Sequence, residues 1–318
     1  GIQVLSPDQV APKDRKSYLL AITVVTASYC DIALPLHRNG WHDVVPFYDV
    51  AEAYKDRHPL TNGWSANLLT ENDVNRLKTV LLKWSDDISR AHHIQFLAWR
   101  CIREEWIFSY APIRNDNKFF IPEIRNNLTE NEIFADVGAH VGSVTQKFIK
   151  IVNKKFNKIF MFEPDSKNLA HLKTNTLRSY PDLYDKIEIS SEFIGKNCDN
   201  ILFAEGYGYA SQKSLLGSKL LNTVPFDDLN IAATFIKLHL EGGELEALFG
   251  SRKTIIKNRP IIAVTSYHNS LGIYALPEWL MTELNDYNII MRLHSWCGTG
   301  AVIYCIPKER SSIMTSLG

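Results

Sequence analysis

Three polar residues alternate along the otherwise apolar stretch from Phe235 to Leu240 and the turn that follows it. In a β-strand, Lys237, His239 and Glu241 share one face, because successive side chains point to opposite sides. Burying three such groups is unfavourable unless they meet partners or a wet cleft. Histidine titrates near neutral pH, so His239 is a chemically sensible acceptor of a proton from a substrate hydroxyl. We therefore select these three residues as catalytic candidates.

A second strand at residues 261–267 delivers His268 to the same sheet edge. Ligands bind at the carboxyl ends of strands in open α/β sheets, so His239, Glu241 and His268 are expected to lie together. A histidine considered alone is more often structural, but the shared edge favours one of the two as a general base. A two-histidine, one-carboxylate metal site is the alternative reading, and spacing alone does not settle it. The prediction that we carry forward has no metal.

A glycine turn follows the apolar run at residues 132–137 and precedes a helical pattern that begins at Ser143, a candidate N-cap. Strand, glycine turn and helix N-terminus together let the backbone approach a ligand closely. The carboxylate of Asp136 repels phosphate, so the turn suits a cationic or hydroxyl-rich ligand better. The cofactor-binding candidates here are Asp136, Gly138, Ala139, His140 and Gly142, with His140 shaping the pocket.

Glu163 ends the next strand, at residues 158–163. A carboxylate in this position can accept hydrogen bonds from both hydroxyls of a ribose, which does not separate NAD from other adenosine cofactors. The alternative is that Glu163 caps the following helix near Asp165. The glycine turn upstream favours ribose binding.

Strand and helix patterns alternate from Glu132 onward, which indicates an open, mostly parallel sheet with helices on both faces. Two close strands joined by a glycine-containing loop predict an antiparallel hairpin at the end of the chain. The scattered Gly, Ser and Asn of residues 195–230 indicate an irregular acceptor loop. The predicted strands are 132–137, 158–163, 186–190, 234–240, 261–267, 288–294 and 301–307, and the predicted helices are 143–152, 166–178, 244–257 and 275–285.

The chain before Glu132 divides into two further pieces. Residues 18–25, 30–39 and 42–50 read as strand, helix with Gly40 as its C-cap, and strand interrupted by Pro46. This half of a Rossmann unit lacks the glycine-rich turn, which favours a structural or oligomerisation role. A capping box at Thr70 and Asp73 begins one helix, and a second covers about 88–108. The predicted domains are 1–62, a small α/β extension; 63–128, a helical connecting segment; and 129–318.

Adjacent His92 and His93 point in different directions on a helix, so we predict surface or interdomain residues and not a metal pair.

Composition limits the class of protein. The 318 residues include 35 Lys and Arg and 35 Asp and Glu, so the zero net charge disfavours nucleic-acid and polybasic membrane binding. The five cysteines form no CxxC pair, which favours free thiols in a reducing cytoplasm. The apolar run at 18–25 is too short to span a bilayer. The first residue is Gly1 rather than methionine, which leaves open whether the sequence is a piece of a longer protein.

Taken together, three stretches resemble the FkbM family of S-adenosylmethionine-dependent methyltransferases. They are Asp136, Gly138, Ala139 and Gly142; Phe162-Glu163-Pro164; and Ile236, Lys237, Glu241, Gly242 and Glu244, with Pro225-Phe-Asp-Asp-Leu229 as the lead-in. The resemblance covers about residues 119–307. It implies a class I methyltransferase (Rossmann-like) sheet, S-adenosylmethionine as cofactor, and transfer of methyl to a hydroxyl oxygen of a glycan, sugar or secondary metabolite. His239 stands where the family usually has aspartate, which leaves metal dependence open.

Two alternatives remain beside an O-methyltransferase. One is an NAD(P)-dependent sugar-modifying oxidoreductase, and the other is a non-catalytic scaffold that binds the cofactor. The expected partner is a small-molecule or glycan acceptor, with no nucleic acid and no membrane span, and an oligomerisation role of residues 1–60 would make the chain a homo-oligomer. The acceptor and the methylated position stay undetermined.

Overall fold

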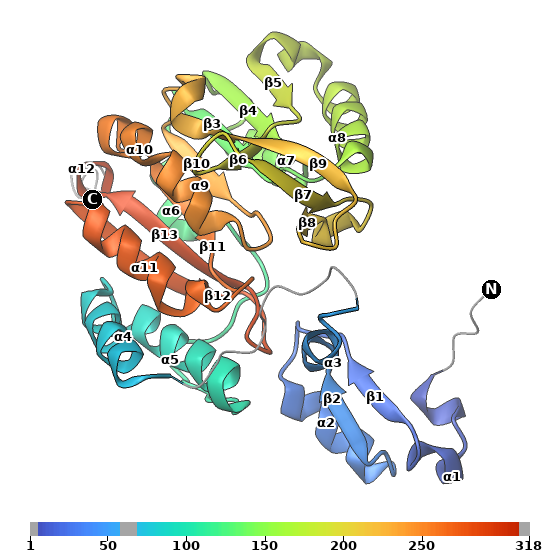
Figure 1. Cartoon of the computed structure of the whole chain (residues 1–318). Coiled ribbons are helices and arrows are strands. Elements are labelled where there is room, and N and C mark those ends of the chain that lie inside the picture. The colour runs from blue at the N-terminus through green and yellow to red at the C-terminus, as the bar shows by residue number, and fades with distance from the viewer. Residues whose placement is uncertain (1–5, 58–68, 312–318) are drawn as a thin grey trace.

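A seven-stranded mixed sheet is the centre of the computed structural model, which describes residues 6–57 and 69–311 (Figure 1). The strand order is β12-β13-β11-β10-β3-β4-β5. β3, the strand that precedes the glycine turn, therefore pairs with β10, the strand that carries Lys237. Five strands are parallel: β3 Ile133–Val137, β4 Lys158–Phe162, β5 Ile187–Ser190, β10 Phe235–Leu238 and β11 Ile261–Thr265. β13 Ala301–Pro307 runs antiparallel to both of its neighbours, β11 and the edge strand β12 Tyr287–Leu293.

Helices cover both faces of this sheet, as the alternation of patterns predicts. Ile236 and Leu238 of β10 pack with one group of helices, and Phe235 packs with the other, because neighbouring side chains alternate between faces. The first group is α9 Glu244–Gly250, α10 Arg252–Asn258 and α11 Leu271–Glu283, and the second is α7 Ser143–Ile151 and α8 Ser166–Ser179. The single helix predicted at 244–257 is two helices that meet at Ser251. Gly142, and not Ser143, is the N-cap of α7.

Residues 195–230 are not an irregular loop, which corrects the sequence prediction. They belong to a second sheet of order β6-β9-β7-β8. Its strands are β6 Phe193–Gly195, β7 Asn200–Ala204, β8 Gln212–Lys213 and β9 Lys219–Pro225. Only one face is buried, around Phe193, Ile201 and Phe203, so these short strands carry a weak hydrophobic pattern.

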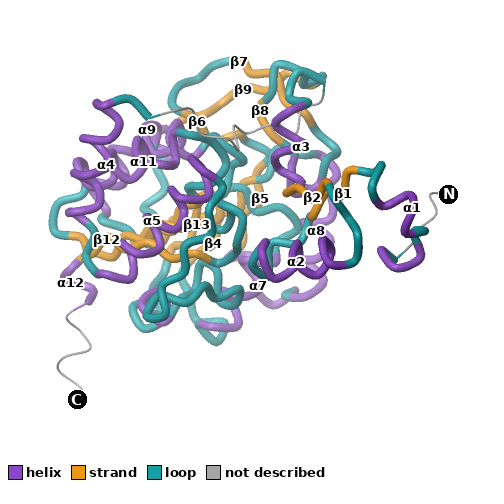
Figure 2. The backbone as a smooth tube through the Cα atoms, turned by 90° about the horizontal axis from the view of Figure 1, so that it is seen from below, coloured by secondary structure: helices purple, strands orange, loops and turns teal. Residues whose placement is uncertain are grey.

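The N-terminal residues form a small unit around the parallel pair β1 Leu19–Ile22 and β2 Asp43–Pro46. The sequence predicts a longer strand interrupted by Pro46. Instead, β2 ends at Pro46 and a helix begins at the next residue, because proline cannot donate a hydrogen bond to a sheet ladder. Figure 2 shows the unit at one side of the molecule with its first helix outermost. Its helices are α1 Pro12–Arg15, α2 Tyr29–Arg38 and α3 Phe47–Ala53.

Hydrogen bonds and an ion pair hold this unit against the rest of the chain. The Glu105 carboxylate accepts hydrogen bonds from the first backbone N–H groups of α2, at Tyr29 (2.5 Å) and Cys30 (2.9 Å). Arg103 pairs with Asp49 at 2.7 Å, and the Trp296 N–H donates to the Val25 carbonyl at 2.8 Å. The unit therefore depends on residues far away in the sequence.

Two helices, α4 Glu71–Lys83 and α5 Asp87–Ile102, pack on α11 and β12. The capping box of Thr70 and Asp73 is present, as predicted. Helix α5 ends before residue 108 because Arg103 adopts a left-handed conformation (φ 60°). The predicted domain boundary at 62 lies outside the described residues. The remaining short elements are α6 Pro122–Arg125, α12 Lys308–Ser311 and the 3₁₀ turns Pro7–Gln9, Pro181–Lys186, Gly208–Ala210 and Phe226–Leu229.

His92 and His93 are buried, which contradicts the surface alternative, and both contact residues beyond Glu132, as the interdomain alternative expects. The His93 Nδ1 atom accepts from the Trp84 indole at 3.0 Å, and its Nε2 atom lies 2.8 Å from the Ile273 carbonyl. His92 is held in the same way between the Leu293 N–H and the Ala111 carbonyl. Both rings are therefore structural. None of the helices within the described ranges combines the length and hydrophobicity needed to cross a membrane.

Candidate functional site

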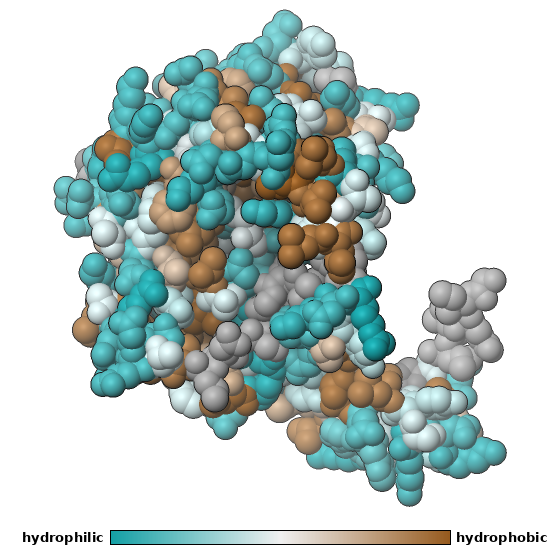
Figure 3. All heavy atoms as spheres, in the orientation of Figure 1, coloured by the Kyte–Doolittle hydropathy of each residue, from teal (hydrophilic) through white to brown (hydrophobic). Residues whose placement is uncertain are grey.

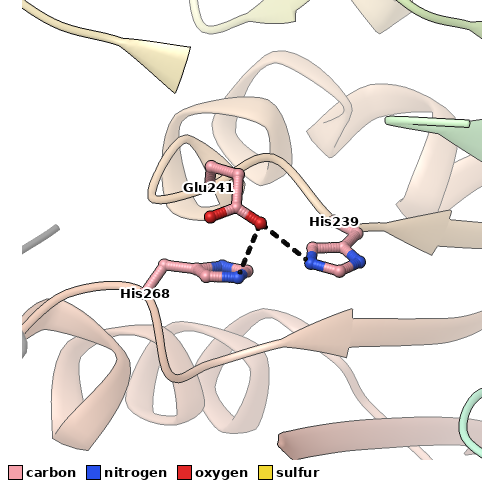
Figure 4. Close-up of side chains that lie close together, drawn as sticks. All are labelled: His239, Glu241 and His268. Atoms are coloured by element: carbon pink, nitrogen blue, oxygen red, sulfur yellow. Dashed lines mark ion pairs between the residues drawn. The ribbon is translucent and has the colours of Figure 1, made fainter. Parts of the chain in front are cut away.

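His239, Glu241 and His268 meet at the carboxyl edge of β10 and β11, as predicted (Figure 4). One carboxylate oxygen, Glu241 Oε1, lies 3.1 Å from His239 Nε2 and 3.2 Å from His268 Nε2. The two imidazoles are nearly parallel, with ring centroids 4.9 Å apart. Three potential ligand atoms therefore lie within 4.8 Å of one another.

Glu241 reaches this cluster from a turn and not from a strand. β10 ends at Leu238, and Glu241 adopts a left-handed conformation (φ 49°) before Gly242. A non-glycine residue in this region is strained, and such strain is common at functional sites. Glu241 therefore lies beside His239, as predicted, but the strand alternation used for that prediction does not extend to Glu241.

Glu244 supports the cluster from behind. Its Oε1 atom lies 2.5 Å from His268 Nδ1 and accepts from the Thr265 hydroxyl at 2.8 Å. Its two oxygens also accept the backbone N–H groups of Leu240 and Gly242, each at 3.0 Å. This buried carboxylate fixes both the orientation of His268 and the path of the turn that carries Glu241.

Lys118 and Tyr267 complete the network, and the sequence prediction missed both. The Lys118 ammonium donates to the Tyr267 hydroxyl at 3.1 Å, and that hydroxyl lies 3.4 Å from His239 Nε2. Lys118 arrives from a loop more than a hundred residues earlier in the chain, where no periodic pattern marks it. Its position next to the buried Phe119 and Phe120 is the one local signal of partial burial.

Burial and neighbouring charges shift the pKa values of the cluster. Burial lowers the pKa of His239 to about 3, with help from the Lys118 ammonium. Burial alone would lower the pKa of His268, but the carboxylates of Glu241 and Glu244 raise it to about 9. The two histidines lower the pKa of Glu241 although burial opposes this. Burial lowers the pKa of Lys118 to about 8. The cluster is therefore a coupled set of charges.

Glu163 faces the glycine turn. Its Oε2 atom accepts the backbone N–H of His140 at 2.7 Å, and its Oε1 atom accepts that of Asp165 at 3.0 Å. Burial raises the pKa of Glu163, and these hydrogen bonds act in the opposite direction. Helix α8 is capped by Asp165 and not by Glu163. Each carboxylate oxygen has two lone pairs, so Glu163 retains capacity for ribose hydroxyls.

Asp136 and Lys237, both predicted to act on ligands, lie below the site. Their side chains are 0% and 1% exposed, and Lys237 Nζ is 2.9 Å from Asp136 Oδ1. Lys237 also donates to the Gly138 carbonyl at 2.6 Å, and the Thr145 hydroxyl donates to Asp136 Oδ2 at 2.7 Å. Neither side chain lines the two hollows beside the cluster. The pair ties the glycine turn to the sheet.

The glycines of the turn lie against other parts of the protein with no room for a side chain. A Cβ atom on Gly138 would lie 1.9 Å from the His239 carbonyl oxygen, and one on Gly142 would lie 2.8 Å from the Leu172 side chain. Both have φ values in the left-handed region, 75° and 88°. The glycines therefore permit close packing of β3, β10 and α8, and their contact with a cofactor stays a prediction. Ala139 is buried in the core between them.

Two hollows meet at the cluster. The first is narrow, about 40 Å³, and is lined by Gly138, His140, Glu163, Tyr209 and His239 among others. Tyr209 narrows it by stacking on His140 with ring centroids 3.8 Å apart. The second is about 580 Å³ and extends along the small sheet past Ile201, Leu202 and Lys213. Glu241 and Phe193 line both, so the cluster lies at their junction.

Leucine side chains gather on the surface of the small sheet (Figure 3). They are Leu202, Leu215, Leu216 and Leu220. Leu202 and Leu215 also line the larger hollow, so its outer end is apolar while its inner end carries Glu241 and Asn269.

Residues 136–288 match the family model of the methyltransferase FkbM domain. The fold is similar to the crystal structure of methyltransferase FkbM from Methylobacillus flagellatus KT, with a TM-score of 0.69 and 23% sequence identity, over 86% of this chain and 70% of that one. A putative rRNA-methylase from Clostridium thermocellum is more distant, with a TM-score of 0.37, 13% identity and coverage of 58% and 90%. Among curated proteins, no sequence matches the chain.

Proposed function

We propose that the enzyme transfers the methyl group of S-adenosylmethionine to a hydroxyl oxygen, and the match of residues 136–288 to the methyltransferase FkbM domain is the premise. The observation that carries the proposal is the position of Glu241, which lines both hollows. A reaction between two bound molecules requires such a junction. The acceptor class is a glycan, sugar or hydroxylated secondary metabolite.

The first hollow has the chemistry of a nucleoside site. Glu163 is held by two backbone N–H groups and can accept ribose hydroxyls, and His140 offers an aromatic face for a base. Its volume of about 40 Å³ is too small for the cofactor while Tyr209 lies on His140. Tyr209 is 67% exposed, so its ring can turn outward without breaking a packed core. We therefore expect cofactor binding to displace Tyr209.

The second hollow accommodates the acceptor. Its space of about 580 Å³ suits a molecule of sugar size or larger. S-adenosylmethionine supplies an activated methyl group, so the protein's main task is to align the acceptor oxygen with it. Positioning of this kind contributes up to roughly 7–11 kcal/mol.

We assign removal of the hydroxyl proton to the cluster of His239, Glu241 and His268. The oxygen forms a bond to the methyl carbon, the carbon–sulfur bond breaks with its electron pair remaining on sulfur, and the hydroxyl proton leaves toward the cluster. Proton transfer of this kind typically contributes about 10²–10⁴-fold to the rate.

The experiment has two measurements. Calorimetric titration with S-adenosylhomocysteine and with NAD identifies the cofactor class, and we expect the former to bind more tightly. Methyl transfer from labelled S-adenosylmethionine to a panel of hydroxylated acceptors then tests the reaction. His239→Asn should lower turnover by about 10²–10⁴-fold at nearly unchanged cofactor affinity.

Glu163→Gln tests the cofactor site separately. The substitution removes the negative charge of the group that we expect to accept the ribose hydroxyls, so S-adenosylhomocysteine binding should weaken by roughly 10-fold or more. Glu188→Gln is the matched control, because Glu188 is an exposed acid on the neighbouring strand β5. Tighter binding of NAD, or equal affinities of the two variants, would contradict the proposal.

A further inference from the structure

We infer that His239, Glu241 and His268 form a binding site for one divalent transition-metal ion. The inference rests on the proposed function, because the ion would hold the acceptor oxygen. Within residues 6–57 and 69–311, these three side chains are the group of histidine, cysteine and acidic residues whose ligand atoms approach one another in this way.

The spacing of the ligand atoms fits a common ion. Two atoms that each lie about 2.1 Å from the same metal are roughly 3.0–3.4 Å apart in octahedral or tetrahedral coordination. Glu241 Oε1 lies 3.1 Å from His239 Nε2 and 3.2 Å from His268 Nε2. Figure 4 shows the two imidazoles approaching this oxygen from different strands.

The orientation of His268 also fits coordination. Its Nδ1 atom lies 2.5 Å from Glu244 Oε1, the arrangement in which a metal-bound histidine donates its other N–H to a carboxylate. Nε2 then presents a lone pair toward Glu241 Oε1, which also carries lone pairs. Two such atoms at 3.2 Å need a positive charge between them. A proton or a metal ion can supply that charge, and the experiment below separates the two.

The surrounding charges and space allow an ion. Glu241 and Glu244 carry two negative charges, which outweigh the single charge of Lys118, located beyond the Tyr267 hydroxyl. Three protein ligands leave coordination positions open, as in catalytic sites with two histidines and one carboxylate. Glu241 lines the larger hollow, so an open position would face the acceptor.

The ion would make the acceptor hydroxyl more acidic, as metals do for bound water. With the ion bound, the ligand atoms of the cluster would not accept the hydroxyl proton, which would leave to solvent instead; the oxygen would attack the methyl carbon, and the carbon–sulfur electron pair would stay on sulfur. The ion itself is neither oxidised nor reduced in this step.

The experiment measures ion binding directly. Untagged protein with all 318 residues is dialysed against EDTA, returned to chelator-free buffer and titrated with Co²⁺ and Zn²⁺ by calorimetry. The visible d–d absorption of Co²⁺ reports the ligands of the ion. We expect one ion per chain and a rise in the unfolding temperature with added ion.

His239→Ala and His268→Ala should abolish this binding. Glu244→Gln, which removes only the charge behind His268, should weaken it by about 10–100-fold. His171→Ala is the matched control, since His171 is exposed on α8 and far from the cluster in sequence. Circular dichroism establishes that each variant is folded, and Glu244→Gln keeps the test valid should an alanine variant unfold.

Absence of Co²⁺ and Zn²⁺ binding by the wild type, or binding by the histidine variants equal to that of His171→Ala, would overturn the inference and leave a proton as the bridging charge. Methyl transfer that persists after complete removal of metal would overturn it as well, while the proposed function would stand. Failure to bind S-adenosylhomocysteine would instead overturn the proposed function, because Glu163 lies outside the metal cluster.

Discussion

Replacing Lys237 by methionine should destabilise the protein strongly, because it leaves the carboxylate of Asp136 buried without its cation. Both side chains are at most 1% exposed, and Lys237 Nζ also donates to the Gly138 carbonyl. After the substitution, Asp136 retains the hydrogen bond from Thr145. Breaking a buried ion pair on one side costs about 3–5 kcal/mol. Against a typical stability of about 5–15 kcal/mol, this is a large fraction.

Urea unfolding followed by circular dichroism measures the effect. We expect the free energy of unfolding of Lys237→Met to fall by about 3–5 kcal/mol. Lys150→Met is the matched control, because Lys150 is exposed on α7 and its replacement should change stability by less than about 0.5 kcal/mol.

The double variant Asp136→Asn/Lys237→Met separates charge burial from lost packing. An asparagine amide still accepts the Thr145 hydroxyl but carries no charge, so the double variant should be more stable than the sum of the single losses implies. We expect a coupling energy of about 0.5–3 kcal/mol. Additive losses, or a loss below about 1 kcal/mol for Lys237→Met, would refute the reasoning. A Lys237→Met protein of normal stability without turnover would restore the catalytic role that the sequence indicated.

Two further perturbations test other parts of the structure. Gly138→Ala should lower the unfolding free energy by at least about 2 kcal/mol, because the added Cβ would lie 1.9 Å from the His239 carbonyl oxygen. Gly40 also has a positive φ but has open space around it, so Gly40→Ala should lower the unfolding free energy by about 1–2 kcal/mol at most. Equal losses for the two variants would contradict this reasoning. Burial lowers the pKa of His92 and His93 to about 4, so between pH 6.5 and pH 4 the unfolded chain binds more protons than the folded chain. The free energy of unfolding should therefore fall across this pH range by on the order of 3 kcal/mol per histidine. A urea midpoint that is unchanged between pH 7 and pH 4.5 would show that neither ring is held neutral.

The main sheet could be predicted from the sequence because its strands are short apolar runs separated by helical patterns. Their order and direction bring His239 and His268 to one edge, which follows from parallel pairing of β10 and β11. The alternation along β10 also made Lys237 a catalytic candidate. Lys237 lies two residues before His239, further from the sheet edge, and its ammonium group pairs with Asp136. The period of a strand gives the face of a side chain and not its depth.

The rest of the site depends on contacts between distant segments. Lys118 and Tyr267 are joined by a hydrogen bond across 149 positions of the chain, which no local pattern encodes. The small sheet escaped prediction because β6 and β8 have only three and two residues. The hydrogen bonds of Glu244 with His268 and Thr265 likewise join residues more than twenty positions apart. These arrangements become visible only once the chain is folded.

The N-terminal unit has an unusual position in the order of synthesis. A two-stranded parallel pair with a core of Ile22, Ala33, Trp41 and Val44 is too small to be stable alone. One hydrogen bond that holds the unit runs from the backbone N–H of Trp296 to the Val25 carbonyl. It can form only after roughly 240 further residues have been made, which takes on the order of 10–50 s at the speed of the ribosome. The unit therefore completes its contacts with the rest of the chain long after its own residues are made.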